Sequence, residues 1–496
     1  MYDILIIGGG INGAGIARDA AGRGLKVLLC EKDDLASHTS SASTKLIHGG
    51  LRYLEQYDFA LVRKALMERE VLLRAAPHII WPLRFVLPHH KELRPSWLIR
   101  LGLFLYDHLG GRKLLPATKT RTRKNSTVFD PLKPHFRTGF EYSDCWVEDS
   151  RLVVLNAVDA VERGAEMMPR TACVDLTPKD GNWQAQLKSD SGALTTVEAK
   201  TVINAAGPWV DAIAGQAGLN SNAPQVRLVK GSHIIVPKLF DDPRSFIFQT
   251  GDGRVVFAIP YENGQFTLIG TTDLPYEDNL DQVEASPDEI DYLCAVASEY
   301  FERPVTADQV VATYSGVRPL FDDQAEDASS VTRDYVLKLQ DRDGAPILSV
   351  IGGKITTYRK LAEDVLAHLS AAFPNAQTKW TAEAALPGGD IADADFDAFA
   401  AQCAKSYAWM DPALLNRLAR AYGTRIETLL GSATSEADLG KHYGGGLYQR
   451  EIDYLVTHEF ARTPEDILQR RTKLGLHVDV AVAADLQSQL QMALVA

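Results

Sequence analysis

Residues 2–31 contain the feature that most constrains the fold, an apolar run of strand length that leads directly into closely spaced glycines. Residues 2–7 form the run, and Gly8, Gly10 and Gly13 follow it in a Gly-x-Gly-x-x-Gly pattern. The first glycine permits a tight turn, the second lets backbone approach a pyrophosphate, and the third lets helix and strand pack closely. The alanine-rich segment 14–23 predicts a helix whose free N–H groups attract a diphosphate. This segment therefore predicts a dinucleotide-binding domain.

An acidic residue closes the second apolar run of the same segment. Residues 27–30 form that run, and Glu31 follows it eighteen positions after Gly13. In a dinucleotide-binding βαβ unit an acid at this place accepts hydrogen bonds from the adenosine ribose. A Gly-x-Gly-x-x-Gly pattern alone is weak, but here the strand, the helix and the acid all stand in register.

Length, charge and cysteine content limit the class of protein. The chain has 496 residues, which is enough for roughly two to four domains. Its net charge of −12 argues against a general nucleic-acid binder, because phosphate contacts require an excess of Lys and Arg. The five cysteines are scattered, with no CxxC pair and no metal-ligand spacing. They predict reduced thiols in a cytoplasmic compartment and no bound metal.

Three later segments favour a flavin over a nicotinamide dinucleotide. Residues 39–53 combine small hydroxyls with Lys45 and the adjacent Gly49 and Gly50, which allow backbone contact with a flat ring. Residues 204–207 and 351–354 are two further strand ends that run into glycines. A helix start beside an isoalloxazine would stabilise the negative charge of the reduced ring.

The segments after residue 170 do not alternate simply between strand and helix, so two domains are expected to interleave. The expected fold class is α/β plus α, with a Rossmann-like FAD-binding domain, a mixed-sheet substrate-binding or cap domain, and an all-helical C-terminal domain. We expect the FAD-binding domain at 1–75, 146–230 and 312–375, the cap domain at 76–145 and 231–311, and the helical domain at 386–496.

With these motifs in place, the chain resembles the aerobic FAD-dependent glycerol-3-phosphate dehydrogenases of the D-amino-acid-oxidase-like flavoprotein superfamily. The motifs that carry the resemblance are residues 6–17, 45–54, 139–146, 230–234, 270–273, 314–319 and 352–359. The resemblance implies oxidation of sn-glycerol 3-phosphate to dihydroxyacetone phosphate by hydride transfer from C2 to FAD. It also implies ubiquinone in the membrane as the electron acceptor.

We expect FAD to bind noncovalently, because no cysteine stands at an obvious attachment position beside the flavin-facing motifs. The predicted cofactor contacts are Gly8, Gly10, Asn12, Gly13, Glu31, Ser40, Ser41, Lys45, Leu46, His48, Gly49, Gly50, Val174, Ala206, Gly207, Gly353, Lys354, Ile355 and Thr356.

The reaction also requires cations for the phosphate and a group that accepts a proton. Arginine suits phosphate because its planar fork makes two charge-assisted hydrogen bonds. The predicted substrate contacts are Arg52, Tyr53, Thr272, Arg318, Arg333 and Lys354, and the predicted catalytic residues are His233, Arg318 and Lys354. His48 competes with His233 for the role of base. We favour His233 as the base or orienting group and place His48 against the flavin.

Residues 97–106 predict an apolar, aromatic helix, and six basic residues with no acid among them follow between Arg112 and Lys124. On an acidic protein this local reversal of charge suits an anionic bilayer surface. We therefore expect peripheral attachment to the inner face of the cell membrane. A homodimer is a further possibility that the sequence does not decide.

Two other functions stay open at this point. One is an oxidase of the same fold that passes electrons from glycerol phosphate or an amino acid to O₂, which would release peroxide. The other is a tRNA-modifying flavoprotein, which the acidic charge opposes.

Overall fold

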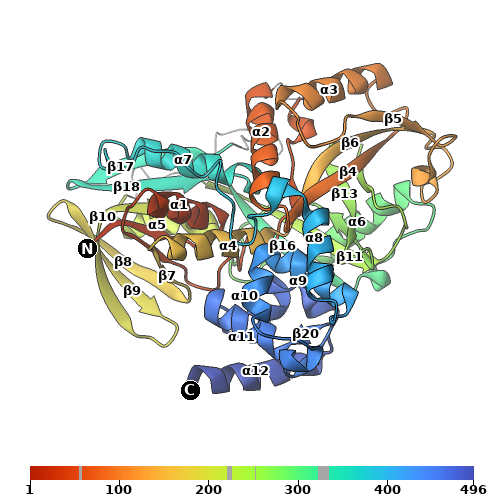
Figure 1. Cartoon of the computed structure of the whole chain (residues 1–496). Coiled ribbons are helices and arrows are strands. Elements are labelled where there is room, and N and C mark those ends of the chain that lie inside the picture. Colours follow the sequence, from red (N-terminus) through yellow and green to blue (C-terminus); the bar gives the residue numbers. More distant parts are fainter. Residues whose placement is uncertain (55–57, 220–225, 252, 322–333, 496) are drawn as a thin grey trace.

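Two large β-sheets and a separate helical domain make up the protein. The structure is a computed structural model that describes the whole chain except residues 55–57, 220–225, 252, 322–333 and 496, and except the side chains of 52 and 491–495. In Figure 1 the first sheet lies at the left, the second at the right, and the blue C-terminal helices lie below both. This arrangement confirms the predicted α/β plus α fold class.

The first sheet is built outward from the N-terminal strand. Its parallel strands, in spatial order, are β18 (Ala345–Ile351), β10 (Leu194–Asn204), β1 (Tyr2–Ile7), β2 (Val27–Cys30) and β7 (Glu166–Met168). Antiparallel strands complete it, namely β17 (Val336–Arg342), β8 (Thr171–Lys179) and β9 (Asn182–Ser189). Ile4–Ile7 are all buried, as expected for a parallel strand covered on both faces.

Helices cover this sheet, and their packing fixes where α1 begins. α1 (Ile11–Gly22) packs between α4 (Asp149–Glu162) and α7 (Tyr358–His368), and α5 (Val210–Gln216) follows β10. Small residues allow the close approach, because a Cβ added at Gly15 of α1 would lie 2.5 Å from the Tyr358 ring. The N-terminus of α1 is thereby fixed at the carboxyl end of β1.

The second sheet is mixed and has an aromatic core. Its strands are β15 (Leu274–Pro275), β11 (Val226–Pro237), β14 (Phe266–Gly270), β13 (Val255–Tyr261), β12 (Ser245–Gln249), β4 (Ile80–His89), β6 (Thr138–Val147) and β3 (Leu46–Ile47), with β16 (Ala312–Phe321) on β11 and β5 (Lys119–Thr122) on β6. The β12–β4 pair is parallel, whereas the other pairs are antiparallel. Helix α6 (Pro287–Tyr300) packs on one face of this sheet through Leu293 and Ala297.

Two helices lie beside the second sheet, α2 (Phe59–Ala75) and α3 (Ser96–Leu109). The bounds of α3 agree within three residues with the helix predicted at 97–106. Among the described residues no helix combines the length and apolar character needed to cross a bilayer.

Two strands lie in a different sheet from the one expected. Strands β3 and β16 belong to the second sheet, although residues 46–47 and 312–321 fell within the expected FAD-binding domain. Strand β4 forms where the sequence shows no clean period, because pairing with β6 along its whole length offsets the two prolines it contains. The order of strands in a sheet is set by pairing between residues far apart in the sequence. The domain boundaries expected from the sequence did not include that pairing.

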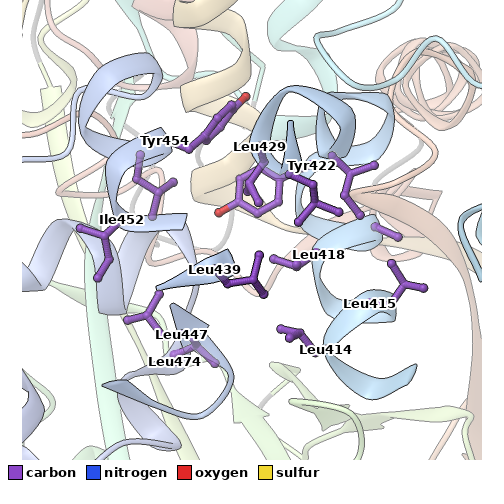
Figure 2. Close-up of a cluster of buried hydrophobic side chains, with 14 of the residues drawn as sticks. Leu414, Leu415, Leu418, Tyr422, Leu429, Leu439, Leu447, Ile452, Tyr454 and Leu474 are labelled. Atoms are coloured by element: carbon purple, nitrogen blue, oxygen red, sulfur yellow. The ribbon is translucent and has the colours of Figure 1, made fainter. Parts of the chain in front are cut away.

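The C-terminal domain has its own hydrophobic core (Figure 2). Its helices are α8 (Phe396–Ser406), α9 (Pro412–Tyr422), α10 (Ile426–Leu430), α11 (Gln449–His458) and α12 (Val480–Val495). Leu415 and Leu418 of α9, Leu429 of α10 and Ile452 of α11 all contribute side chains to this core. The domain also contains a short hairpin, β19 (His442–Gly444) with β20 (Leu447–Tyr448), which the all-helical prediction did not include.

Candidate active site

A cavity of about 460 Å³ lies between the carboxyl ends of the first sheet's strands and one face of the second sheet. The first wall is formed by the β1–α1 turn, the end of β10 and residues 352–356. The second wall is formed by β11, β16 and residue 271, and the loop 36–44 connects the two.

In the turn between β1 and α1, backbone atoms lie so close to two positions that only glycine fits there. Gly8 has a φ of 115°, and a Cβ there would lie 2.4 Å from the Ala205 carbonyl oxygen. A Cβ at Gly13 would lie 1.9 Å from the Gly8 carbonyl oxygen. Both positions therefore exclude any side chain, and the N–H groups at the start of α1 face the cavity.

Glu31 and Ser40 complete this wall. The Glu31 carboxylate accepts hydrogen bonds from the Gly9 amide at 2.6 Å and the Asp33 amide at 2.9 Å, and burial raises its pKa. Two carboxylate oxygens offer about four acceptor positions, so Glu31 retains capacity for ribose hydroxyls. Ser40 Oγ accepts from the Ile11 amide at 2.9 Å, at the first turn of α1.

The second wall is defined by the register of β11 against β16. His233 pairs with Tyr314, Gly231 with Gly316, and Val229 with Arg318. Directly opposed residues point to the same face, so His233 and Arg318 lie on one face with two glycines between them. The Arg318 guanidinium extends over this gap, because a Cβ added at Gly231 would lie 2.7 Å from Arg318 Nη2.

His233 is buried and held on two sides. Its Nε2 lies 2.9 Å from Thr44 Oγ1, and the Tyr314 ring stacks on it with centroids 4.7 Å apart. Burial, assisted by the positive charges of Lys45 and Arg318, lowers the pKa of His233 to about 3. The imidazole is therefore neutral at physiological pH.

Arg318 is anchored by its neighbours in the same wall. Its Nη2 donates to the Thr272 carbonyl oxygen and to Asp273 Oδ1, both at 3.1 Å. These two contacts fix the orientation of the guanidinium in the second wall.

Lys354 and His48 approach the cavity from the first wall. Lys354 Nζ lies 3.6 Å from the Tyr53 ring centroid. The His48 amide donates to Thr356 Oγ1, and that hydroxyl donates to the His48 carbonyl oxygen, both at 3.3 Å. Burial, with the nearby charges of Lys354 and Arg69, lowers the pKa of His48 to about 3. Residues from two distant motifs thus meet at one end of the cavity.

The structure brings most of the predicted site residues to this cavity. Those that line it are Gly8, Gly10, Asn12, Glu31, Ser40, Leu46, His48, Tyr53, Ala206, Gly207, His233, Arg318, Gly353, Lys354, Ile355 and Thr356. Among the described residues, those predicted but not lining it are Gly13, Ser41, Lys45, Gly49, Gly50, Val174 and Thr272. Arg333 and the Arg52 side chain lie outside the described part of the chain.

The side chains that miss the cavity have specific other partners. Lys45 was expected to contact the cofactor, but its ammonium pairs with buried Asp149 at 2.9 Å. Thr272 Oγ1 donates to Glu289 at 2.7 Å, on the far side of the wall, and Thr271 lines the cavity instead. Val174 is 38% exposed, whereas Cys173 lines the cavity. Neighbouring residues of a strand point to opposite faces, so an expectation that is wrong by one residue places the side chain on the wrong face.

Several lining residues were not predicted, among them Thr44, Gly231, Thr271 and Trp209. A glycine inside an otherwise apolar strand marks a close approach to a neighbour, and that signal was available at Gly231. Nothing local in the sequence distinguishes Thr44 from the other hydroxyl residues of its loop.

The first wall of the cavity suits a nucleotide, and the second carries titratable side chains. Together the two walls define the protein as a dinucleotide-dependent oxidoreductase built from two interleaved domains. Residues 3–359 match the family described as FAD dependent oxidoreductase, and residues 379–490 match the C-terminal domain of alpha-glycerophosphate oxidase. The chain belongs to the FAD dependent oxidoreductase family, and FAD is its cofactor. The glycine turn, Glu31 and Ser40 fit the adenosine diphosphate half of FAD.

Similar proteins extend over nearly the whole chain. It is 52% identical to the D-erythritol 1-phosphate dehydrogenase of Brucella abortus, covering 97% of this chain and 96% of that protein. It is 52% identical to the glycerol-3-phosphate dehydrogenase of Pseudomonas aeruginosa, covering 99% and 95%. The crystal structure of the glycerol-3-phosphate dehydrogenase from Bacillus halodurans complexed with FAD superposes with a TM-score of 0.76 at 28% identity, covering 100% and 89%.

Proposed function

We propose that this protein oxidises sn-glycerol 3-phosphate at C2 to dihydroxyacetone phosphate and passes the electrons to a membrane quinone. The observation that carries the proposal is the second wall of the cavity, where an anchored arginine and a neutral histidine share one face across a glycine gap. The glycerol-3-phosphate dehydrogenases among the similar proteins support the same substrate.

Three polar side chains of the cavity, those of Arg318, His233 and Lys354, have a role in the proposed oxidation. Bound FAD supplies the two-electron acceptor. Arg318 binds the phosphate dianion through charge-assisted hydrogen bonds. Neutral His233 accepts the proton of the C2 hydroxyl or orients that hydroxyl. Lys354 stabilises negative charge that develops on the substrate oxygen.

Anaerobic titration of the purified yellow protein tests this assignment. We expect sn-glycerol 3-phosphate to bleach the visible flavin absorbance, and glycerol to react with a kcat/KM at least about 10³ lower, since it lacks the phosphate that would make charge-assisted hydrogen bonds with Arg318. D-Erythritol 1-phosphate should be titrated in parallel, because one similar protein carries that name. A higher kcat/KM for the longer phosphate would replace the proposed substrate.

The proposed cofactor attachment is noncovalent. Cys30 and Cys173 line the nucleotide end of the cavity, but burial raises the pKa of both thiols, that of Cys173 to about 12. Protonated thiols are poor nucleophiles. Acid precipitation should therefore leave the yellow colour in the supernatant, and flavin retained on the pellet would contradict this part of the proposal.

Helix α3 is the proposed membrane-docking element. Its outer face exposes apolar side chains, including Trp97, which is 67% exposed, and Phe104, which is 50% exposed. Of the basic residues that follow, Arg121 pairs with Glu141 and Arg123 donates to backbone carbonyls. Lys113, Lys119 and Lys124 are exposed. An apolar face bordered by lysines suits the surface of an anionic bilayer.

Flotation with lipid vesicles tests the docking. The protein should float with anionic vesicles and less with neutral ones, and Trp97→Glu with Phe104→Glu should abolish flotation while leaving flavin bleaching intact. Reduction of a soluble quinone under air, with little peroxide, would support the quinone acceptor. Steady peroxide formation with substrate alone would favour an oxidase that uses O₂.

A further inference from the structure

Several buried or partly buried ion pairs connect the C-terminal domain to the FAD-binding domain. Among them are Arg471–Asp34, Glu459–Arg151 and Asp466–Arg170. Another joins Lys473 to Asp149 at the start of α4, with Lys473 Nζ 2.9 Å from Asp149 Oδ1. This last pair matters for the cavity because Asp149 also holds a loop that lines it.

Asp149 is fully buried and contacts the Ser43–Lys45 segment on its other oxygen. Its Oδ2 accepts from Ser43 Oγ at 2.8 Å and from Lys45 Nζ at 2.9 Å. Glu148, the preceding residue, also binds Lys473 at 3.0 Å. Two ammonium groups and two carboxylates therefore form one charge-balanced cluster in the interior.

The same segment reaches the catalytic histidine. Thr44 Oγ1 lies 2.9 Å from His233 Nε2, and Ser43 and Thr44 both line the cavity. Tyr314, which stacks on His233, donates to the Ser43 carbonyl oxygen at 2.9 Å. An unbroken series of contacts thus runs from the C-terminal domain through Asp149 and the loop to His233.

Backbone conformation shows that these contacts are needed to hold the segment. Lys45 has a φ of 60° and Lys473 a φ of 57°, in the left-handed region that side-chain-bearing residues seldom adopt. Such conformations persist where surrounding contacts fix them. The ion pairs with Asp149 supply those contacts at both ends of the series.

We propose that Lys473 is a positioning residue through which the C-terminal domain fixes the Ser43–Lys45 loop and, with it, the hydrogen bond between Thr44 and His233. The inference rests on the proposed function, in which His233 handles the hydroxyl proton. It gives the C-terminal domain a part in the chemistry of a cavity that its own residues do not line.

Kinetics of Lys473→Met, with Lys473→Arg as the conservative variant, test the proposal. We expect Lys473→Met to lower the rate of flavin bleaching by glycerol 3-phosphate about tenfold, since part of a general-base contribution is lost. KM should change less than about threefold, because Arg318 is untouched. Lys473→Arg should restore most of the rate. The affinity for FAD, measured on the apoprotein, should be unchanged.

The pH dependence provides a readout that a purely structural role would not move. Burial and the like charge of Lys473 lower the pKa of Lys45 to about 8, against the opposing effect of Asp149. Glu148, Tyr261 and Tyr314 are the other titratable groups around the cluster, and His233 is repelled by Lys45. Lys473→Met removes the like charge, so an alkaline limb of the bleaching rate near pH 8 should move to higher pH.

The matched control is Arg425→Met, which breaks the pair Arg425–Glu162 at the other end of α4. It also removes an interdomain ion pair, but one remote from the loop, so rate and pH profile should stay those of the wild type. Equal losses in Lys473→Met and Arg425→Met, or wild-type behaviour of a folded Lys473→Met, would overturn the inference.

Ser43→Ala decides the question if Lys473→Met does not fold. It removes the hydroxyl that Asp149 holds but leaves every charge in place, and it should lower the bleaching rate without a comparable fall in melting temperature. A wild-type rate in Ser43→Ala would also contradict the proposal. Failure of the proposed function itself is separate, because it would show as no bleaching in the wild type.

Discussion

The two walls of the cavity use opposite means to build a binding surface. The first wall, called here the nucleotide wall, is centred on the glycine turn, where neighbouring residues bind through backbone groups and the absence of side chains, as at Gly8 and Gly13. The second wall, called here the substrate wall, depends on side chains that are distant in sequence. Its His233 is hydrogen-bonded to Thr44, 189 residues away. A local motif therefore specifies the glycine turn, and strand pairing specifies the substrate wall.

This difference predicts how each wall tolerates change. A glycine of the nucleotide wall is fixed by backbone atoms that cannot move aside, whereas Gly231 of the substrate wall faces the ends of flexible side chains. Changes at the glycine turn of the first wall should abolish cofactor binding. Changes in the second should alter kinetics while the flavin stays bound.

The largest effect is expected for Gly13→Ala. The added Cβ would lie 1.9 Å from the Gly8 carbonyl oxygen, so the turn must open, at a cost of about 3 kcal/mol or more. We expect FAD binding to weaken by more than about 100-fold, so that the protein purifies colourless. Absorbance at the flavin bands of the purified protein measures this.

Two glycine variants serve as controls for that result. A Cβ at Gly102 of α3 meets nothing within 4 Å, so Gly102→Ala should purify yellow with normal kinetics. Gly231→Ala should also purify yellow but with a raised KM, because it displaces the Arg318 guanidinium. A colourless Gly231→Ala protein would break the distinction between the walls.

The next largest effect is expected for Lys354→Met. Lys354 approaches the cavity where charge develops during oxidation, and loss of one such stabilising donor costs on the order of 100-fold in kcat. Stopped-flow measurement of flavin bleaching should show this loss with FAD still bound. A normal kcat would remove Lys354 from the catalytic set.

A smaller effect is expected for Arg318→Lys. The charge is retained, but the bidentate fork is lost, together with at least one of the hydrogen bonds to Thr272 and Asp273. KM for glycerol 3-phosphate should rise about tenfold, with kcat changing less. Steady-state kinetics decide the point, and a fall in kcat at constant KM would assign Arg318 a different role.

The smallest effect is expected from acidification. Burial lowers the pKa of His233 to about 3, so the ring stays neutral and kcat/KM should fall less than about twofold between about pH 7 and pH 5.5. An acid limb near 6.5 that disappears in His233→Gln would show that the ring titrates normally.

Stability should respond more than activity to the same change in pH. His48, His78 and His233 all have pKa values lowered to about 3 by burial. The unfolded chain takes up these protons near pH 6.5, so the stability present above that pH is lost as the pH falls toward the folded value. His78→Leu should reduce the dependence of the unfolding free energy on pH, measured by urea denaturation.

The sequence by itself determined the glycine turn and the acid of the nucleotide wall. It also determined that a helical domain follows the FAD-binding and substrate-binding segments. A strand, a glycine turn, a helix and an acid are contiguous, and each has a residue requirement that is visible without knowing the rest of the fold. The helical C-terminal domain was likewise readable from residue 386 onward, because its pattern is local and its core is its own.

Only the tertiary structure decided which side chains form the substrate wall. It also decided which residues pair with the buried charges behind the cavity. The pairing of β11 with β16 places His233 and Arg318 on one face, and no local pattern encodes which strands will pair. Lys45 does not reach the cavity because Asp149, from another segment, offers it a buried charge partner. A buried charge must be paired, and only the folded chain shows which partner lies within reach.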